Sequence, residues 1–497
     1  MSVRTGAQFI EGLRAQARDV WVRGERVADV ASHPAFAGAV QELARLYDMQ
    51  HDPALRDVLT YTVEETGDRA GAAFMPSFSQ ADLAKHREAY RLWAQASFGL
   101  MGRSPDFMNA TVLAFFEAQD LLAEGGEHFA DNAANYYRYV RDRDLFLSHA
   151  LVSPQNDRSK ASSELANLHL RVVEERDDGI IVSGARMIAT LGPVADEILL
   201  YNLPGLKPGD EDHAICFAIE AGAPGLRQIC REPYDAPNRQ SFDHPLSTRF
   251  EENDSLLIFD RTFVPWERVF IYRNVNLANR FYVDSAIRNH TAHQTNVRAL
   301  IKMQFVAGLC IAVARSIKAD QFLHVQKMLG ELVSDVEMIK SGIVRAEFEA
   351  ETTALGTLRP SLPPLQALRT YLPRIYPRAI EYLQTIGAGG FMLMPSGADF
   401  MASEIADDMN TFYSGAGGMP SIDRVKLFKL AWDLAGEAFG QRLVQYERYY
   451  AGDPIRTLAM TYLGADDREM LALVDAALAL SGEPSATALR VGSTVKP

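Results

Sequence analysis

The sequence has few cysteines and none of the spacings that hold a metal centre. Its only three are Cys216, Cys230 and Cys310, with no CxxC pair and no neighbouring histidine cluster. Zinc sites and iron–sulfur clusters need several such ligands at short, regular intervals. The sequence therefore predicts three buried thiols in a reducing compartment and no metal.

Basic residues are outnumbered by acidic ones, and long apolar runs are scarce. The net charge is -14 and the isoelectric point is near 5.3, whereas phosphate binding needs a basic surface, so nucleic acid is excluded as a partner. The longest apolar run, residues 305–314, has about half the length needed to cross a bilayer. The first 22 residues lack a small-residue cleavage signal. We expect a cytoplasmic protein without membrane contact.

The apolar pattern changes twice along the chain. Residues 1–150 repeat apolar side chains every three or four positions, which predicts an α-helical first domain. Residues 151–275 alternate with a period of two between Gly, Pro, Asp and Asn, which predicts a middle β-barrel domain. Residues 276–497 return to long helical runs, which predict a four-helix bundle followed by a polar tail. The predicted fold is mainly α with one β domain.

Five sequence blocks identify a family. They are FGLMGRSPDF (98–107), DLFLSHALVSPQNDRSK (144–160), LIFDRTFVPWERVF (257–270), AHQTNVRALIKMQFVAG (292–308) and AWDLAGEAFGQRLVQYERYYAGD (431–453). In this order they resemble the oxygenase component of the 4-hydroxyphenylacetate 3-monooxygenase family over nearly the whole chain. The resemblance implies an acyl-CoA dehydrogenase-like fold with the domain order given above.

The resemblance also implies an activity. Members of this family take reduced flavin from a separate NAD(P)H:flavin reductase, react it with O2 to a C4a-hydroperoxyflavin and hydroxylate a small phenol ortho to its hydroxyl group. FADH2 is implied rather than FMNH2, flavin exchange is mostly by diffusion, and the oxygenase is a homotetramer. Because the hydroperoxide is a weak electrophile, a cationic or basic group at the phenol oxygen is needed to favour the phenolate.

Two positions match the family's substrate pocket. Arg103 would supply a permanent charge and His149 a group that titrates near neutral pH. Many phenylacetate hydroxylases have Tyr four residues after this Arg, and Phe107 stands there instead, which argues against 4-hydroxyphenylacetate itself as the substrate. The alternatives are structural: Arg103 could cap a helix or pair with Asp106, and His149 could be a core histidine.

Two further histidine candidates lie near the start of the first long helix of the bundle. His290 and His293 fall about 60° apart on one helical face. By resemblance, His293 steadies the hydroperoxide or takes the phenol proton, with His290 in reserve; a helix-end cap or core pair is the alternative. Arg298 lies roughly 140° from His293, which suggests that it reaches a phosphate or a neighbouring subunit.

No GxGxxG follows a strand, so the sequence gives no support for a Rossmann-type flavin site. By resemblance the flavin lies between the β domain and the bundle, where loop amides and hydroxyls meet the ring and an arginine meets phosphate. The implied cofactor-binding residues are Gln155, Asn156, Asp157, Arg158, Thr190, Arg298, Gly389, Gly390 and Arg442. The glycines could also be plain turns, and Arg442 could be a solvated helix residue or cross a subunit boundary.

Other functions were weighed against this one. An acyl-CoA dehydrogenase shares the fold but not these blocks, and 4-hydroxybutyryl-CoA dehydratase needs cluster-binding cysteines that the region around Arg103 lacks. N-oxidation, or dehalogenation or denitration of a phenol, would use the same flavin chemistry and remains open. A non-catalytic scaffold would have no need for Arg103, His149 and His293.

Overall fold

The structure is a computed structural model that describes residues 3–157, 159–160, 162–165, 167–234 and 239–480. The first part of the chain is mainly helical and also supplies five short strands. Its elements are α1 (Gly6–Ala15), β1 (Asp19–Val22), β2 (Glu25–Arg26), α2 (Pro34–Met49), α3 (Arg56–Leu59), β3 (Thr60–Thr62), β4 (Arg69–Gly71), α4 (Gln80–Ala96), α5 (Pro105–Glu117), α6 (Gln119–Ala123), α7 (Glu127–Arg143) and β5 (Leu147–His149).

The middle of the chain forms two open sheets and not the predicted barrel. Its strands are β6 (Arg171–Arg176), β7 (Gly179–Thr190), β8 (Glu197–Leu200), β9 (Ile215–Glu220), β10 (Leu226–Cys230), β11 (Asp254–Pro265) and β12 (Val269–Tyr272), with the short helix α8 (Ser247–Phe250) before β11. One sheet has the order β2-β1-β10-β11-β7-β6 and the other β12-β9-β8-β5. The barrel prediction is wrong because the end strands of each sheet do not pair with one another among the described residues.

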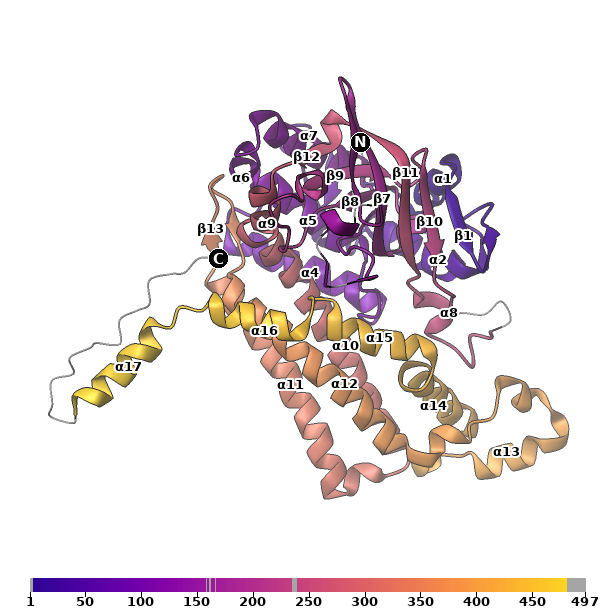
Figure 1. Ribbon diagram of the computed structural model, residues 1–497. Coiled ribbons are helices and arrows are strands. Elements are labelled where there is room, and N and C mark those ends of the chain that lie inside the picture. The colour runs from indigo at the N-terminus through magenta and orange to yellow at the C-terminus, as the bar shows by residue number, and fades with distance from the viewer. Residues whose placement is uncertain (1–2, 158, 161, 166, 235–238, 481–497) are drawn as a thin grey trace.

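The first 150 residues contribute strands to both sheets, which periodicity alone did not predict. Strand β1 pairs in parallel with β10, and β5 pairs in parallel with β8. The longest ladder joins β11 to β7 and sets Asp254 opposite Thr190 at its end. Residues far apart in the sequence therefore meet at the edge of the sheet that faces the bundle (Figure 1).

The last part of the chain is a helical bundle below the sheets (Figure 1). Its elements are α9 (Val275–Asp284), α10 (Ile287–Ser316), α11 (Leu323–Phe348), β13 (Glu351–Thr352), β14 (Leu358–Arg359), α12 (Leu362–Met392), α13 (Ala406–Phe412), α14 (Ser421–Ala435), α15 (Ala438–Tyr449), α16 (Pro454–Leu463) and α17 (Arg468–Ala479). The run expected to be the fourth long helix is divided into α14 and α15, because α14 ends at Gly436.

Helix α10 is the centre of the bundle and of the core. It packs against α11 and α12 of the bundle and against α4 and α5 of the first part of the chain. By length and composition it is the one described helix that could cross a membrane, but 67% of its apolar window is buried inside the protein. This burial is what a core helix of a globular protein shows.

A buried ion-pair cluster fastens α15 to α10. The Glu447 carboxylate lies 2.8 Å from Arg298 Nη1 and 2.8 Å from Lys302 Nζ, and all three side chains are almost completely enclosed. Burial opposes ionisation, yet the two cations lower the pKa of Glu447 to about 2. The Glu447 carboxylate is thus the shared counter-charge of two buried cations.

Replacing Glu447 by Ala should lower the free energy of unfolding by about 3–5 kcal/mol, because two buried cations would be left without a counter-charge. Denaturation by urea, followed by circular dichroism at one protein concentration, measures the change. The matched control is Glu337→Ala, which removes an exposed pair with Lys340 and should change little. Equal effects of the two substitutions would contradict the importance given to the buried cluster.

Candidate functional site

Arg103 is held in place by three separate parts of the chain. Its backbone N–H donates to Glu252 Oε1 at 2.7 Å, its Nη1 donates to the Gly102 carbonyl at 3.0 Å, and Nη1 also bonds the Tyr446 hydroxyl. A Cβ at Gly102 would lie 2.4 Å from Tyr446 Cζ, so a larger residue there would force the Tyr446 ring to move. The guanidinium is buried. Its position is thus fixed before any ligand arrives.

Phe107 lies between Arg103 and His149. The guanidinium carbon of Arg103 is 4.2 Å from the Phe107 ring centre, and the His149 ring meets Phe107 edge to face at 5.4 Å. Asp106 accepts a hydrogen bond from Ser104 and forms no ion pair with Arg103. The structure thus brings together all three residues predicted for the substrate pocket.

His149 is a neutral histidine. Burial and the charge of Arg103 lower its pKa well below 6.5, so the expectation that it titrates near neutral pH is wrong. Its ring packs 6.2 Å from Tyr201, and its buried Nδ1 has no hydrogen-bond partner among the described residues. An unpartnered buried nitrogen is costly, and it is a candidate contact for a ligand.

The structure places His290 and His293 away from this pocket. His293 Nε2 lies 2.8 Å from Glu347 Oε1, its ring packs against Tyr90, and His290 Nε2 lies 2.7 Å from Glu117 Oε2. Both are buried pairs between helices, which is the core-pair alternative. The role given to His293 at the reacting oxygen is not supported, because this nitrogen is already bonded to a carboxylate.

Two of the predicted flavin residues meet at one carboxylate. Thr190 Oγ1 donates to Asp254 Oδ1 at 2.6 Å, while Arg442 binds both Asp254 oxygens at 2.8 and 3.0 Å. Burial opposes the ionised form, but Arg442 and Arg231 hold the pKa of Asp254 well below its usual range. Arg442 also lies 3.4 Å from Glu252, the carboxylate that accepts from Arg103. One charge network therefore joins the predicted flavin and substrate residues.

The predicted flavin loop follows Val152, which forms an isolated bridge with Met187 of β7. Gln155 and Asn156 are exposed, Asp157 accepts from Ser159, and Arg158 lies outside the described residues. Arg186, which the sequence did not single out, donates from Nη1 to the Leu151 carbonyl at 3.1 Å and to Ser153 Oγ at 3.0 Å. Burial lowers the pKa of Arg186 to about 10, and its Nε has no partner among the described residues.

Three other predicted cofactor residues lie elsewhere in the chain. Arg298 is 1% exposed and bonded to Glu447 and to the Gly99 carbonyl, so the expectation that it reaches a phosphate or a neighbouring subunit is wrong. Gly389 and Gly390 sit near the far end of α12, beyond a break in the helix at Ala388. A Cβ on Gly390 would lie 2.8 Å from the Phe428 ring, which explains the glycine by packing.

Sequence reasoning missed several residues around the pocket. They are Arg186, Tyr201, Glu252, Tyr282, Arg369 and Tyr446. A weak signal existed for Tyr446, because it belongs to the block at 431–453. The others come from strands, helices and loops whose sequences resemble ordinary amphipathic or polar segments.

Comparison with known proteins gives the same picture over the whole chain. The model of the 4-hydroxyphenylacetate 3-hydroxylase N-terminal domain matches residues 5–271, and that of the C-terminal domain matches residues 278–479. The 4-hydroxyphenylacetate 3-monooxygenase oxygenase component of Thermus thermophilus is 42% identical over 92% of this chain and 94% of the relative. That of Geobacillus sp. is 40% identical over 94% of this chain and 95% of the relative.

A solved structure agrees with the sequence match. The HpaB oxygenase component of 4-hydroxyphenylacetate 3-monooxygenase, crystallised with FAD and 4-hydroxyphenylacetate, has a TM-score of 0.91 and is 41% identical. The match covers 96% of this chain and 99% of that one. From the two domain matches, the identity and the shared fold, this chain belongs to the 4-hydroxyphenylacetate 3-hydroxylase family.

Proposed function

We propose that this protein is the oxygenase component of a two-component, reduced-flavin-dependent monooxygenase that hydroxylates a phenol ortho to its hydroxyl group. The observation that carries this assignment is the grouping of Arg103, Phe107 and a neutral His149 in one buried place. Family membership supports it independently.

Each of the three side chains has a separate role in binding and activating the phenol. The unpartnered Nδ1 of His149 accepts the phenol proton, and the fixed charge of Arg103 stabilises the phenolate oxygen. Phe107 packs beside both groups and excludes water. The ring is thereby made electron-rich at the carbon next to the oxygen, where one C–H becomes C–OH.

The flavin site is proposed at the loop around Gln155 and Asn156. Arg186 lies beneath this loop with a buried, unpartnered Nε, which suits a carbonyl oxygen or an anionic ring. Thr190 donates its proton to Asp254, so its oxygen is free to accept from a ring N–H. Bound FADH2 supplies electrons and activates O2, one atom of which enters the phenol while the other leaves as water.

Ring hydroxylation is preferred to the related reactions. N-oxidation, or removal of a halogen or nitro group, would need recognition of a different substituent, and no described contact favours one of them. Phe107 cannot give the hydrogen bond of the tyrosine that many relatives have, so His149 and Arg103 must hold the phenol oxygen without it.

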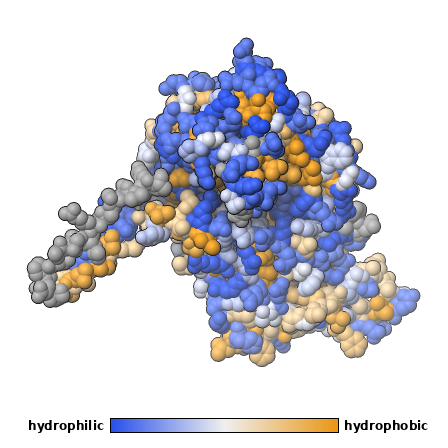
Figure 2. All heavy atoms as spheres, in the orientation of Figure 1, coloured by the Kyte–Doolittle hydropathy of each residue, from blue (hydrophilic) through white to orange (hydrophobic). Residues whose placement is uncertain are grey.

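A homotetramer and a separate flavin reductase complete the proposal, with the cytoplasm as the location. Helix α17 projects from the body and exposes the apolar side chains of Met470, Leu473, Val474 and Leu478 (Figures 1 and 2). These positions repeat every three or four residues and form one face, and large exposed apolar faces mark interfaces. A second copy of the chain would cover it.

Changing Arg103 or His149 to Ala should separate flavin oxidation from hydroxylation. Each variant should lose hydroxylated product by a factor on the order of 100 or more, since charge stabilisation or proton transfer is removed. Flavin oxidation should continue and release peroxide. Product and hydrogen peroxide are counted per FADH2 oxidised.

The matched control is His128→Ala, which changes an exposed histidine. It should keep the parent ratio of product to peroxide. Hydroxylation at the parent rate in either pocket variant would rule out the role given to that residue.

The pH dependence follows from the neutral state of His149. Its pKa lies well below 6.5, so its protonation does not change between pH 6 and 8. The ratio of product to flavin oxidised should therefore show no step from this residue across that range. A step near pH 6.5 in the parent enzyme that disappears in His149→Asn would contradict the prediction.

Leu473→Glu should weaken assembly by placing a charge on the apolar face of α17. Analytical ultracentrifugation should find a tetramer for the parent chain and smaller species for the variant. Ala476→Ser, off this face of the same helix, serves as the control and should stay tetrameric. A monomeric parent chain would refute the proposed assembly.

A further inference from the structure

The aromatic ring of Tyr446 on α15 lies among four positive charges. The guanidinium carbons of Arg103, Arg298 and Arg442 lie 5.3, 5.5 and 5.7 Å from the ring centre. Lys302 Nζ lies 5.7 Å from the same point. At such distances a cation is attracted to the face of an aromatic ring. One ring thus lies beside the arginine of the phenol pocket, the charge network proposed for the flavin and the buried ion-pair cluster.

The hydroxyl group of Tyr446 anchors the guanidinium of Arg103. Arg103 Nη1 donates to this hydroxyl oxygen and to the Gly102 carbonyl, and the hydroxyl group donates to the same carbonyl at 3.3 Å. Arg103 Nε is buried and has no hydrogen-bond partner among the described residues. Because Gly102 directly precedes Arg103, it is Tyr446 that bonds the guanidinium to a distant part of the described chain.

The anchor is a neutral group. Burial raises the pKa of Tyr446, and although Arg103 and Arg298 oppose this effect, the pKa stays above its ordinary value. A protonated hydroxyl group can accept from an arginine and donate to a carbonyl at once, whereas a phenolate could only accept. The bond from Tyr446 therefore fixes the guanidinium of Arg103 and adds no negative charge beside it.

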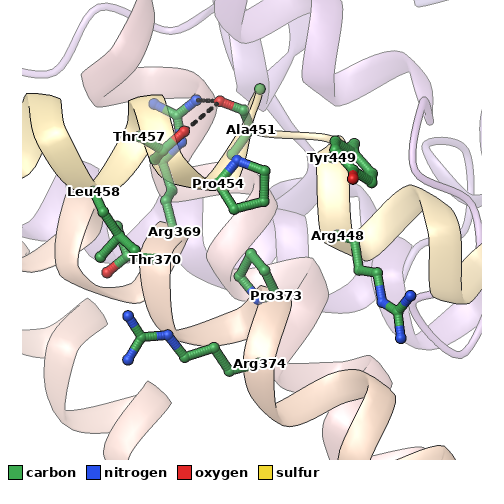
Figure 3. Close-up of a pocket in the computed structure, with 11 residues that line it drawn as sticks. Arg369, Thr370, Pro373, Arg374, Arg448, Tyr449, Ala451, Pro454, Thr457 and Leu458 are labelled. Carbon is green, nitrogen blue, oxygen red and sulfur yellow. Dashed lines mark hydrogen bonds between the residues drawn. The ribbon is translucent and has the colours of Figure 1, made fainter.

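Helix α15 is itself anchored to other helices on the C-terminal side of Tyr446. The next residue, Glu447, belongs to the buried ion-pair cluster on α10. Just beyond the end of α15, at a surface pocket, Arg369 of α12 and Thr457 of α16 both donate to the Ala451 carbonyl, at 3.3 and 3.5 Å (Figure 3). These contacts fix the turn of α15 that carries the Tyr446 hydroxyl group.

We propose that Tyr446 is a positioning residue for hydroxylation: its hydroxyl group orients the guanidinium of Arg103 toward the phenol oxygen without neutralising it. A carboxylate in this place, such as those that pair with Arg298 and Arg442, would compete with the phenolate for the positive charge. A neutral anchor instead keeps the charge of Arg103 available where negative charge develops. The inference rests on the proposed function and adds to it the residue that orients Arg103.

Tyr446→Phe tests this role, because it removes the hydroxyl group and keeps the ring among its cations. The assay uses FADH2 with phenol, 4-chlorophenol, 4-nitrophenol and 4-hydroxyphenylacetate, and continues with the phenol that gives the parent enzyme most product. The ratio of hydroxylated product to FADH2 oxidised should fall by roughly 10-fold, because a hydrogen bond to a charged group is lost. The rate of FADH2 oxidation and the affinity for reduced FAD should stay as in the parent enzyme.

The matched control is Tyr450→Phe, one turn further along α15. The Tyr450 ring is stacked on that of Tyr446, with ring centres 5.8 Å apart, and its buried hydroxyl group has no hydrogen-bond partner among the described residues. This variant breaks no hydrogen bond and should keep the parent ratio of product to FADH2 oxidised. Equal losses in the two variants would indicate a general effect on the packing of α15 and would overturn the inference.

A double-mutant cycle with Arg103→Ala separates positioning from a purely structural role. If Tyr446 acts through Arg103, adding Tyr446→Phe to Arg103→Ala should lower the product ratio no further, whereas independent effects multiply. A further fall by the factor seen with Arg103 present would overturn the inference, and so would an unchanged ratio in Tyr446→Phe alone. A parent enzyme that hydroxylates none of the four phenols would instead refute the proposed function.

Discussion

Glu252 is the contact on which the geometry of the site depends. Its carboxylate is almost completely buried, accepts the backbone N–H of Arg103 and faces Arg442. Arg103 belongs to the first helical part, Glu252 to the segment before β11 and Arg442 to the bundle, so one side chain ties three regions together. Because Asp254 lies two residues further on and binds Thr190 and Arg442, the residues proposed for the flavin and for the substrate share one support. The hydrogen bonds from Arg103 to Glu252 and from Thr190 and Arg442 to Asp254 are buried and charge-assisted, which makes them strong and directional.

Burial and the neighbouring charges then determine the protonation state of each group. His149 is neutral because burial and Arg103 both disfavour its charged form, and that makes it a proton acceptor at neutral pH. Glu447 is ionised because two cations outweigh its burial. The same physics therefore gives a neutral histidine and a structural ion pair within one core.

Sequence reasoning succeeded where the residues are local. Arg103 lies just before α5 and Phe107 lies in the first turn of this helix, so their contact follows from neighbouring positions. It failed for His293, whose place on the helix was right but whose partner, Glu347, comes from α11. It failed for Arg298 in the same way, because Glu447 is 149 residues away. Partners this distant leave no trace in a helical period.

The sequence by itself determined the helical and strand-forming segments and the family, and it singled out Arg103 and His149 as candidates, because periodicity and short motifs are local properties of a chain. Only the tertiary structure decided that the strands form two open sheets, that β1 and β5 join them, and that His149 is neutral. It also decided that Arg369 of α12 donates a hydrogen bond to Tyr282 of α9. Burial and long-range pairing set these features, and both arise only when distant segments pack together.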